Sequence, residues 1–223
     1  QVEDVDAVIV PVGGGGLIAG VAMAVKLLKP TCQVIGVEPV HAPSLTASLH
    51  RGESVRVSTR STIADGLAVA KAGPNVVPVA SKYVDEMVLV NDNEIAMGVL
   101  SMLEQEKTVA EGAGATGLAP FLDTEDSTGL RERLAGKNVV IIICGGNIDV
   151  SLVGRVVDHG LAADGRLCQI YCLISDRPGG LADFARVIAD TGASTMEMTH
   201  DRKFAGDDFA RVMIKTQLQT RDR

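Results

Sequence analysis

The chain has 223 residues, 46% of them hydrophobic and 22% charged, a composition that suits a packed core and excludes global disorder. Its net charge of -7 and its 3% share of aromatic residues argue against a nucleic-acid or membrane-surface partner. No apolar run is long enough to span a bilayer. The 4 cysteines lack a second pair or a histidine cluster that would complete a zinc site, so we expect reduced thiols in a cytoplasmic protein.

The first half of the chain alternates apolar strands with helices. Residues 6–12 and 33–39 are apolar runs typical of buried strands, and residues 17–28 between them are typical of a helix. A strand, a glycine turn, a helix and a second strand form a βαβ unit, whose strands are parallel. Residues 44–52 predict a short helix that ends at a glycine, and residues 55–82 predict a loop with one more short helix.

Two further strands are predicted downstream. Residues 86–90 are strand-like, and Asn91 or Asn93 can cap a helix that runs to about residue 105. A strongly apolar strand within residues 137–149 runs into a pair of glycines. The pattern therefore predicts an α/β fold with a parallel twisted sheet flanked by helices.

The sequence changes character near residue 164, after an amphipathic stretch that predicts a helix. We place a domain boundary there, with residues 1–163 in the first domain and residues 166–223 in the second. The second domain begins in the order strand, helix, strand, strand, which is typical of a ferredoxin-like α+β unit. We expect it to be truncated before its last helix and strand.

The run Gly13 to Gly16 stands between the first strand and the following helix. Backbone amides that point outward at a helix N-terminus form an anion site, and glycine leaves no Cβ in the way. A tight turn alone would need only one or two glycines, so the run favours phosphate binding. No Gly-Lys-Ser/Thr sequence follows, which excludes a P-loop, whereas a dinucleotide pattern half fits over Gly14, Gly16 and Ala19 with Glu38 further on.

A second glycine turn, "CGGNID", follows the strand within residues 137–149. Ligands of open α/β sheets bind beyond the carboxyl ends of the strands, so both turns would reach one compact ligand. The segment "AEGAGATG" adds a third possible wall, with Glu111 as its only charge.

Five segments together resemble one enzyme family: "VPVGGGGLIAG", "VEPVHAPS", "TIADGLAV", "EGAGATGLAP" and "CGGNID". Their order and spacing are similar to those of the pyridoxal-phosphate-dependent threonine/serine dehydratases of fold type II. The segment from "SDRPGGLADFARVIADTGASTMEMTHDR" onward resembles the ACT domain that follows the catalytic part in longer threonine dehydratases. The resemblance implies dehydrative deamination of L-threonine, and of L-serine, by β-elimination with pyridoxal 5'-phosphate.

The same resemblance implies which residues bind the cofactor. Its phosphate would be bound by the backbone amides of the glycine loop, namely Gly13, Gly14, Gly15, Gly16 and Leu17. Other residues would line the pocket: Gly66, Glu111, Cys144, Gly145 and Asn147. Cys144 would lie beside the pyridine nitrogen, where a neutral thiol suits elimination. The alternatives are a buried strand residue for Cys144 and a surface helix cap for Glu111.

A divalent cation site is implied in the racemase-like relatives of this family. Its ligands here would be Glu38, the carbonyl of Ala42, and Ser44, which stands where such relatives often have aspartate. The substitution of a hydroxyl for a carboxylate weakens the prediction of a metal.

The family's Schiff-base lysine lies in a Ser-x-Lys-x-Arg-Gly type motif, and none of the lysines of this chain lies in such a motif. We therefore expect the chain to be a fragment, inactive by itself, of a parent enzyme whose lysine lies upstream. We also expect an amino-acid effector at the ACT-like domain and a dimeric or tetrameric assembly. Two alternatives stay open, which are a serine racemase of the same fold and a non-catalytic protein that binds a nucleotide or an amino acid.

Overall fold

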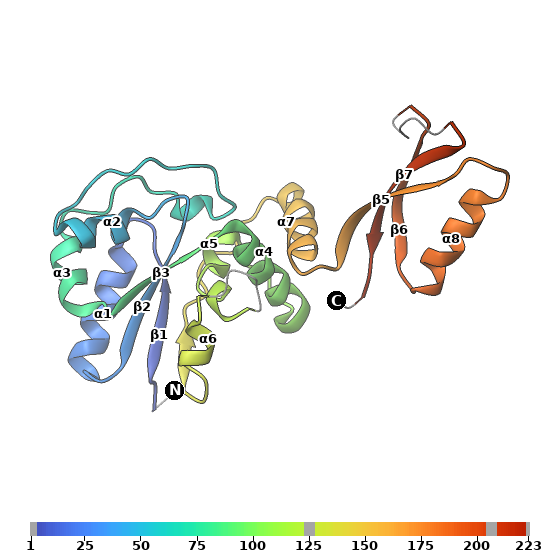
Figure 1. Ribbon diagram of the computed structural model, residues 1–223. Helices are drawn as coiled ribbons and strands as arrows, with labels where there is room; N and C mark the ends of the chain where they lie inside the picture. Colours follow the sequence, from blue (N-terminus) through green and yellow to red (C-terminus); the bar gives the residue numbers. More distant parts are fainter. Residues whose placement is uncertain (1–3, 123–127, 204–208, 222–223) are drawn as a thin grey trace. The chain divides into compact units, whose positions relative to one another are not determined.

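The computed structural model describes residues 4–122, 128–203 and 209–221 (Figure 1). Its contacts divide the chain into two units, Gln1–Gly160 and Leu161–Arg223, and each unit has its own sheet. This division falls within α7 (Val150–Ala163), a few residues before the domain boundary that the sequence predicts near residue 164.

The first unit contains a four-stranded parallel sheet. Its strands are β1 (Ala7–Pro11), β2 (Gln33–Pro39), β3 (Glu86–Val90) and β4 (Val139–Ile141), in the order β3-β2-β1-β4. Every residue of β1 is buried, because neighbouring strands pair with both of its edges and helices cover both of its faces. The parallel sheet expected from the apolar runs is therefore confirmed.

The two faces of this sheet carry different helices (Figure 1). Ile18 of α1 (Gly16–Leu28), Leu45 of α2 (Ser44–Arg51) and Ala80 of α3 (Val76–Tyr83) pack together on one face. On the other face, the core includes Ile95 of α4 (Asp92–Ser101) and Leu130 of α6 (Leu130–Arg133). Shorter elements complete this unit: η1 (Asp65–Leu67), η2 (Met102–Glu106), α5 (Gly112–Ala115) and η3 (Ala119–Phe121).

The sequence allows Asn91 or Asn93 as the N-cap of α4, and the structure shows which one it is. Asn91 is the cap, because its Oδ1 accepts a hydrogen bond from the Glu94 amide at 3.1 Å while Glu94 Oε2 accepts one from the Asn91 amide at 2.7 Å. The α-helix ends at Ser101 and continues as the π-helical turn η2, which Lys107 closes with a left-handed φ of 55°. The predicted helix to about residue 105 is thus confirmed in extent, with a wider last turn.

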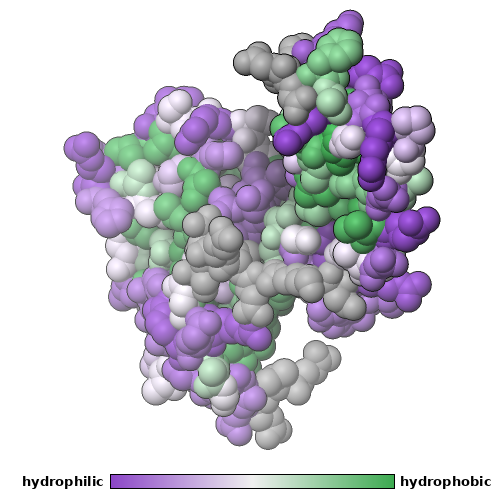
Figure 2. Space-filling model, turned by 45° about the vertical axis from the view of Figure 1, so that its right-hand side comes forward, coloured by the Kyte–Doolittle hydropathy of each residue, from purple (hydrophilic) through white to green (hydrophobic). Residues whose placement is uncertain are grey.

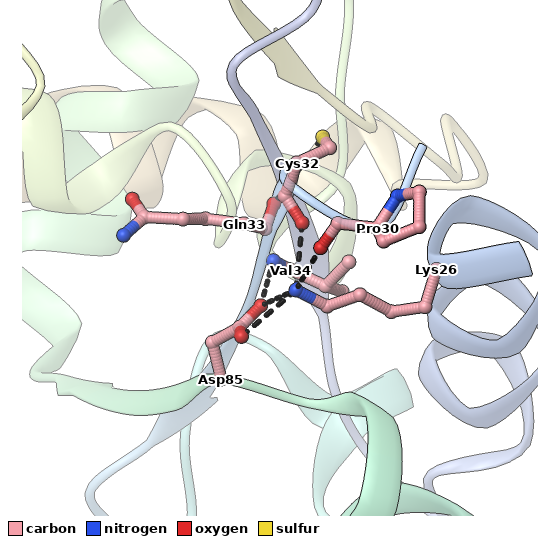
Figure 3. A network of polar contacts seen from close by, with 6 residues as sticks. All are labelled: Lys26, Pro30, Cys32, Gln33, Val34 and Asp85. Atoms are coloured by element: carbon pink, nitrogen blue, oxygen red, sulfur yellow. Dashed lines mark hydrogen bonds and ion pairs between the residues drawn. The ribbon is translucent and has the colours of Figure 1, made fainter. Parts of the chain in front are cut away.

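Lys26 ties the end of α1 to the sheet (Figure 3). Its Nζ donates to Cys32 O at 2.8 Å and lies 2.7 Å from Asp85 Oδ2. Asp85 Oδ2 also accepts the Val34 amide at 2.6 Å, so one carboxylate joins the beginnings of β2 and β3. This network fixes the position of the last turns of α1 relative to the beginnings of β2 and β3.

The second unit is a three-stranded antiparallel sheet with one helix. Its elements are β5 (Leu167–Ser175), α8 (Gly180–Asp190), β6 (Ser194–Asp201) and β7 (Arg211–Gln219), and the strand order is β5-β7-β6. The predicted order of strand, helix, strand, strand is confirmed. Apolar residues also reach the surface of this unit (Figure 2), among them Leu173, Val187 and Met196.

Candidate functional site

The glycine loop joins the carboxyl end of β1 to the N-terminus of α1. Gly15 is the cap of α1 and has a left-handed φ of 84°. From Gly13 onward, the Ala19 amide is the first that has an acceptor, since it donates to Gly15 O at 3.1 Å. Over the described ranges, the amides of residues 13–18 have no acceptor, and the first turn of α1 contains no acidic residue. The loop therefore presents several backbone donors at the positive end of a helix dipole.

The rest of the unit holds the glycine loop in this shape. Gly14 O accepts the Gly73 amide at 3.1 Å, and Ser44 Oγ lies 3.5 Å from Gly13 O. A Cβ atom on Gly15 would lie 2.6 Å from Val76 Cγ1, a separation that forces the neighbour to move. The loop is thus held from outside and tolerates no side chain at its left-handed position.

The second and third glycine segments pack against each other. Glu111 precedes α5, and its amide donates to Gly145 O at 3.2 Å. A Cβ atom on Gly114 would collide with the carbonyl oxygens of Cys144 and Gly145. These glycines allow two backbones to approach closely beyond the end of β4.

The turn η1 connects the glycine loop to this second group. On one side, a Cβ atom on Gly13 would lie 3.1 Å from Leu67 Cα. On the other side, a Cβ atom on Gly66 would lie 3.2 Å from the Ala113 Cβ and 3.9 Å from Glu111 Oε1. The segment "TIADG" therefore lies between the two glycine-rich regions, which places four of the quoted motifs in one neighbourhood.

A cleft of about 470 Å³ opens beside Glu111. Several of the residues that line it lie in the quoted motifs, among them Asp65, Glu111 and Asn147. Of the predicted site residues, Glu111 and Asn147 line the cleft, whereas Gly66, Cys144 and Gly145 lie near Glu111 without lining it. The glycine loop adjoins this group through Leu67. No lysine is among its lining residues.

Sequence reasoning missed several polar residues that line the cleft, among them Thr62, Asp92 and Arg155. Thr62 belongs to the quoted "TIADG" segment, and Asp92 directly follows the predicted strand and its cap, so position alone could have indicated both. Arg155 lies within α7 and had no such signal.

Burial keeps the Cys144 side chain in its thiol form. Desolvation is the main cause that raises the pKa of Cys144, and the negative charge of Glu111 raises it further. The raised pKa keeps the Cys144 thiol neutral at neutral pH, so it is not activated as a nucleophile.

The three residues predicted to bind a cation have other partners in the structure. Glu38 is fully buried, and its two carboxylate oxygens accept the Leu45 amide at 2.8 Å, the Thr46 amide at 2.9 Å and Thr46 Oγ1 at 2.7 Å. The carbonyl of Ala42 accepts the Ser44 amide at 2.9 Å. This donor set does not fit a divalent cation, because its one carboxylate already binds the N-terminus of α2.

The glycine loop, in contrast, fits a phosphate group. Its amides have no acceptor among the described residues, no side chain fills the space over Gly16, and no nearby acidic residue in the first turn of α1 opposes an anion. The region can therefore hold the phosphate group of a small cofactor.

Comparison with known proteins agrees with this geometry. The family profile of the pyridoxal-phosphate dependent enzymes matches residues 1–145. The L-threonine ammonia-lyase of Thermotoga maritima is 44% identical over 222 residues, which are 100% of this chain and 54% of that protein. The L-threonine dehydratase catabolic TdcB of Escherichia coli is 42% identical over 153 residues, or 69% of this chain and 45% of that protein. The chain thus spans about half the length of the curated relatives it matches.

Solved structures show the same fold for the first unit. The processed form of threonine deaminase isoform 2 from Solanum lycopersicum has a TM-score of 0.65 and 36% identity, covering 71% of this chain and 45% of that chain. The serine racemase of Dictyostelium discoideum has a TM-score of 0.60 and 37% identity, covering 67% and 46%. No helix in the described ranges is long and apolar enough to cross a membrane. With the family profile matching well over half of its length, the chain belongs to the family of pyridoxal-phosphate-dependent enzymes.

Proposed function

We propose that the protein catalyses the dehydrative deamination of L-threonine, and of L-serine, giving ammonia and 2-oxobutanoate or pyruvate. The observation that carries this proposal is the 44% identity to an L-threonine ammonia-lyase, which extends over both units of the chain. The acceptor-less amides of the glycine loop support it, since they suit the phosphate of the cofactor.

In this proposal the chain supplies the cofactor-binding part of the active site. The amides of Gly13 to Leu17 bind the phosphate, and the helix dipole of α1 adds to the attraction. Gly66, Glu111, Asn147 and the neutral thiol of Cys144 would line the space beside the cofactor. When bound, pyridoxal phosphate supplies the electron sink that loss of the α-proton requires.

The lysine that carries the cofactor belongs, in this proposal, to the part of the relatives' length that this chain does not span. None of the lysines in the described residues lines the cleft. Lys26, for example, is engaged with Asp85 at the opposite end of β2 from the glycine loop. The chain alone should therefore bind the phosphate group weakly and turn over no substrate.

The second unit is proposed to be an ACT-type regulatory domain that binds an amino-acid effector. Its strand, helix, strand, strand order and its antiparallel sheet are compatible with that assignment. A homo-oligomeric assembly and a cytoplasmic location belong to the same proposal.

Serine racemase activity is the second candidate, because a serine racemase is among the similar structures at 37% identity. That match covers 67% of this chain, whereas the match to the ammonia-lyase covers all of it. The sequence similarity that extends over the second unit is to the ammonia-lyase, and it favours ammonia-lyase activity in this proposal.

The direct test is an assay of the full-length protein loaded with pyridoxal phosphate. We expect ammonia and 2-oxobutanoate from L-threonine, pyruvate from L-serine, and a change of rate when isoleucine is added. The same protein without the cofactor is the control. Formation of D-serine without keto acid would favour the racemase, and no reaction with either substrate would contradict both candidates.

A further inference from the structure

The carboxylate of Asp92 lies at the cofactor cleft although the helix that it begins is capped by other residues. Asn91 and Glu94 form the capping box of α4, so α4 does not need Asp92 for that purpose. Asp92 is the first residue of this helix and lines the cleft together with Thr62. Its carboxylate is therefore available to contact another part of the chain.

That contact joins α4 to the segment that follows β2. Asp92 Oδ1 accepts a hydrogen bond from Thr62 Oγ1, and Asp92 Oδ2 lies 3.7 Å from His41 Nδ1. The His41 carbonyl accepts the Arg60 amide at 3.0 Å. The carboxylate at the start of α4 thus binds the connection at Thr62 and lies near it at His41, whose Nδ1 has no hydrogen-bond partner among the described residues.

The Thr62 hydroxyl links the Asp92 carboxylate to the residues that line the cleft. The Thr62 hydroxyl has one hydrogen, which it donates to Asp92. Its oxygen is then oriented to accept a hydrogen bond, and it accepts the Ala64 amide at 3.2 Å. The carbonyl of the fully buried Ala64 then accepts the Leu67 amide at 2.9 Å, which closes η1. The orientation of η1 therefore depends on which way the Thr62 hydroxyl points.

Core packing also restrains the end of this segment, because Ala64 is buried and Ile63 and Leu67 pack against the same core. The Asp92–Thr62 contact adds a polar restraint to this packing. Residues 52–64 form no helix and no strand, and one isolated bridge joins Arg56 to Lys71. Yet η1 must lie within contact of both Gly13 and Ala113 for the glycine loop and the second glycine group to face one ligand. A small displacement of η1 would change the distance between these two regions.

We propose that Asp92, acting through the Thr62 hydroxyl, is a positioning residue that sets the 62–67 wall of the cofactor cleft. This inference rests on the proposed function, because that wall adjoins the site assigned to pyridoxal phosphate. It assigns no chemical step to Asp92 or to Thr62. Their contribution is to hold η1 at the separation that the cofactor needs.

The test uses the full-length protein and the substitution Thr62→Val, which keeps the shape of the side chain and removes its hydroxyl. Thr62→Ser keeps the hydroxyl, and Thr59→Val is the control, since Thr59 is exposed and forms no side-chain hydrogen bond within the described ranges. Hydrogen exchange of a peptide spanning residues 62–68 is measured first, without cofactor. The dissociation constant for pyridoxal phosphate is measured second.

We expect Thr62→Val to speed exchange of this peptide and to weaken cofactor binding, each by about tenfold, the factor for the loss of one net hydrogen bond. Thr62→Ser should restore both quantities, and Thr59→Val should change neither. Asp92→Ala should show the same effects, and combining it with Thr62→Val should add little, because the two side chains act as one unit.

Unchanged exchange in Thr62→Val would overturn the inference, and so would equal effects of the valine and serine variants. Failure of the proposed function has a different signature, because the unmodified protein would then bind no pyridoxal phosphate or leave threonine intact. The exchange measurement needs no cofactor, so it still decides whether the Asp92–Thr62 contact orders the wall.

Discussion

The four glycines that follow β1 are identical in the sequence but have different roles in the structure. Gly15 needs its left-handed backbone and has no room for a side chain, whereas nothing lies within 4 Å of a Cβ atom on Gly16. Gly13 abuts Leu67, so it determines how closely η1 approaches the loop. The sequence predicted an anion-binding loop from the number of glycines, and it could not assign these separate roles because they depend on residues distant in the chain.

Replacing Gly15 by alanine should destabilise the protein by about 1–3 kcal/mol, because the new Cβ meets Val76 and the backbone remains left-handed. Gly20→Ala in the same helix is the matched control, since a Cβ atom there meets nothing within 4 Å. It should leave stability unchanged or raise it by up to about 1 kcal/mol. Urea unfolding of both variants measures the difference, and equal effects would contradict the assigned role of Gly15.

Glu38 makes stability depend on pH. Burial is the largest cause acting on its carboxyl and raises the pKa of Glu38 above its ordinary 4.5, although hydrogen bonds from Thr46 and Leu45 oppose this. A raised folded-state pKa means that the contribution of this group is fully present below about pH 4.5 and is lost as the pH rises through the folded-state pKa.

The stability difference between the unmodified protein and Glu38→Gln should therefore shrink as the pH is raised from 4 to 8. Urea unfolding at several pH values measures it, with the exposed Glu53→Gln as the control that shows no such trend. A difference that grows with pH would mean that the three donors outweigh burial and that the ionised form is the stabilised one.

At the scale of elements, local patterns predicted most of the first unit. The strands β1 to β4 were predicted because they are apolar runs bounded by turn residues, and the cap of α4 because it contains Asn and Asp at the right place. The π-helical turn η2 was not predicted, because its hydrogen bonding depends on where Lys107 closes it. The cation site was predicted from residue types, and the structure adds that α2 places its N-terminal amides on the Glu38 carboxylate.

The Lys26 network joins α1, β2 and β3, so its loss should lower the free energy of unfolding of the first unit. Lys26→Met removes the donor to Cys32 O and leaves Asp85 without its cation. We expect the free energy of unfolding to fall by about 1–2 kcal/mol. This is less than the loss of a buried ion pair would cost, because the Asp85 side chain is 38% exposed. Lys29→Met is the control, since the Lys29 side chain has no hydrogen bond in the described part of the chain, and thermal unfolding of both variants measures the effect. Equal losses in both would show that the network adds nothing specific.

At the scale of the whole molecule, the candidate site is assembled from segments that are far apart in sequence. The glycine loop, η1, α5 and the turn after β4 meet because the parallel strands end at the same edge of the sheet. The quoted motifs were sufficient to predict that these segments lie close together. They were not sufficient to predict the whole cleft, because Arg155 enters it from α7 through tertiary packing that no local pattern records.

The second unit was predicted in element order, and its function rests on similarity alone. In β7 the buried residues Val212, Ile214, Thr216 and Leu218 alternate with half-buried ones, as expected for a strand with one face on the core. The outer strands β5 and β6 have no fully buried residue. This unit is a three-stranded sheet with one helix. A fold of this kind does not determine which effector binds, because that depends on particular side chains.

The central claim is that the glycine loop binds the phosphate of pyridoxal phosphate. Its most direct test compares the dissociation constants of pyridoxal phosphate and pyridoxal, the same ring without phosphate, for the full-length protein and its Gly15→Ala variant. We predict that the phosphate tightens binding at least about a hundredfold in the unmodified protein and that the variant loses most of this difference. Equal affinities for the two compounds, or an unchanged ratio in the variant, would contradict the claim.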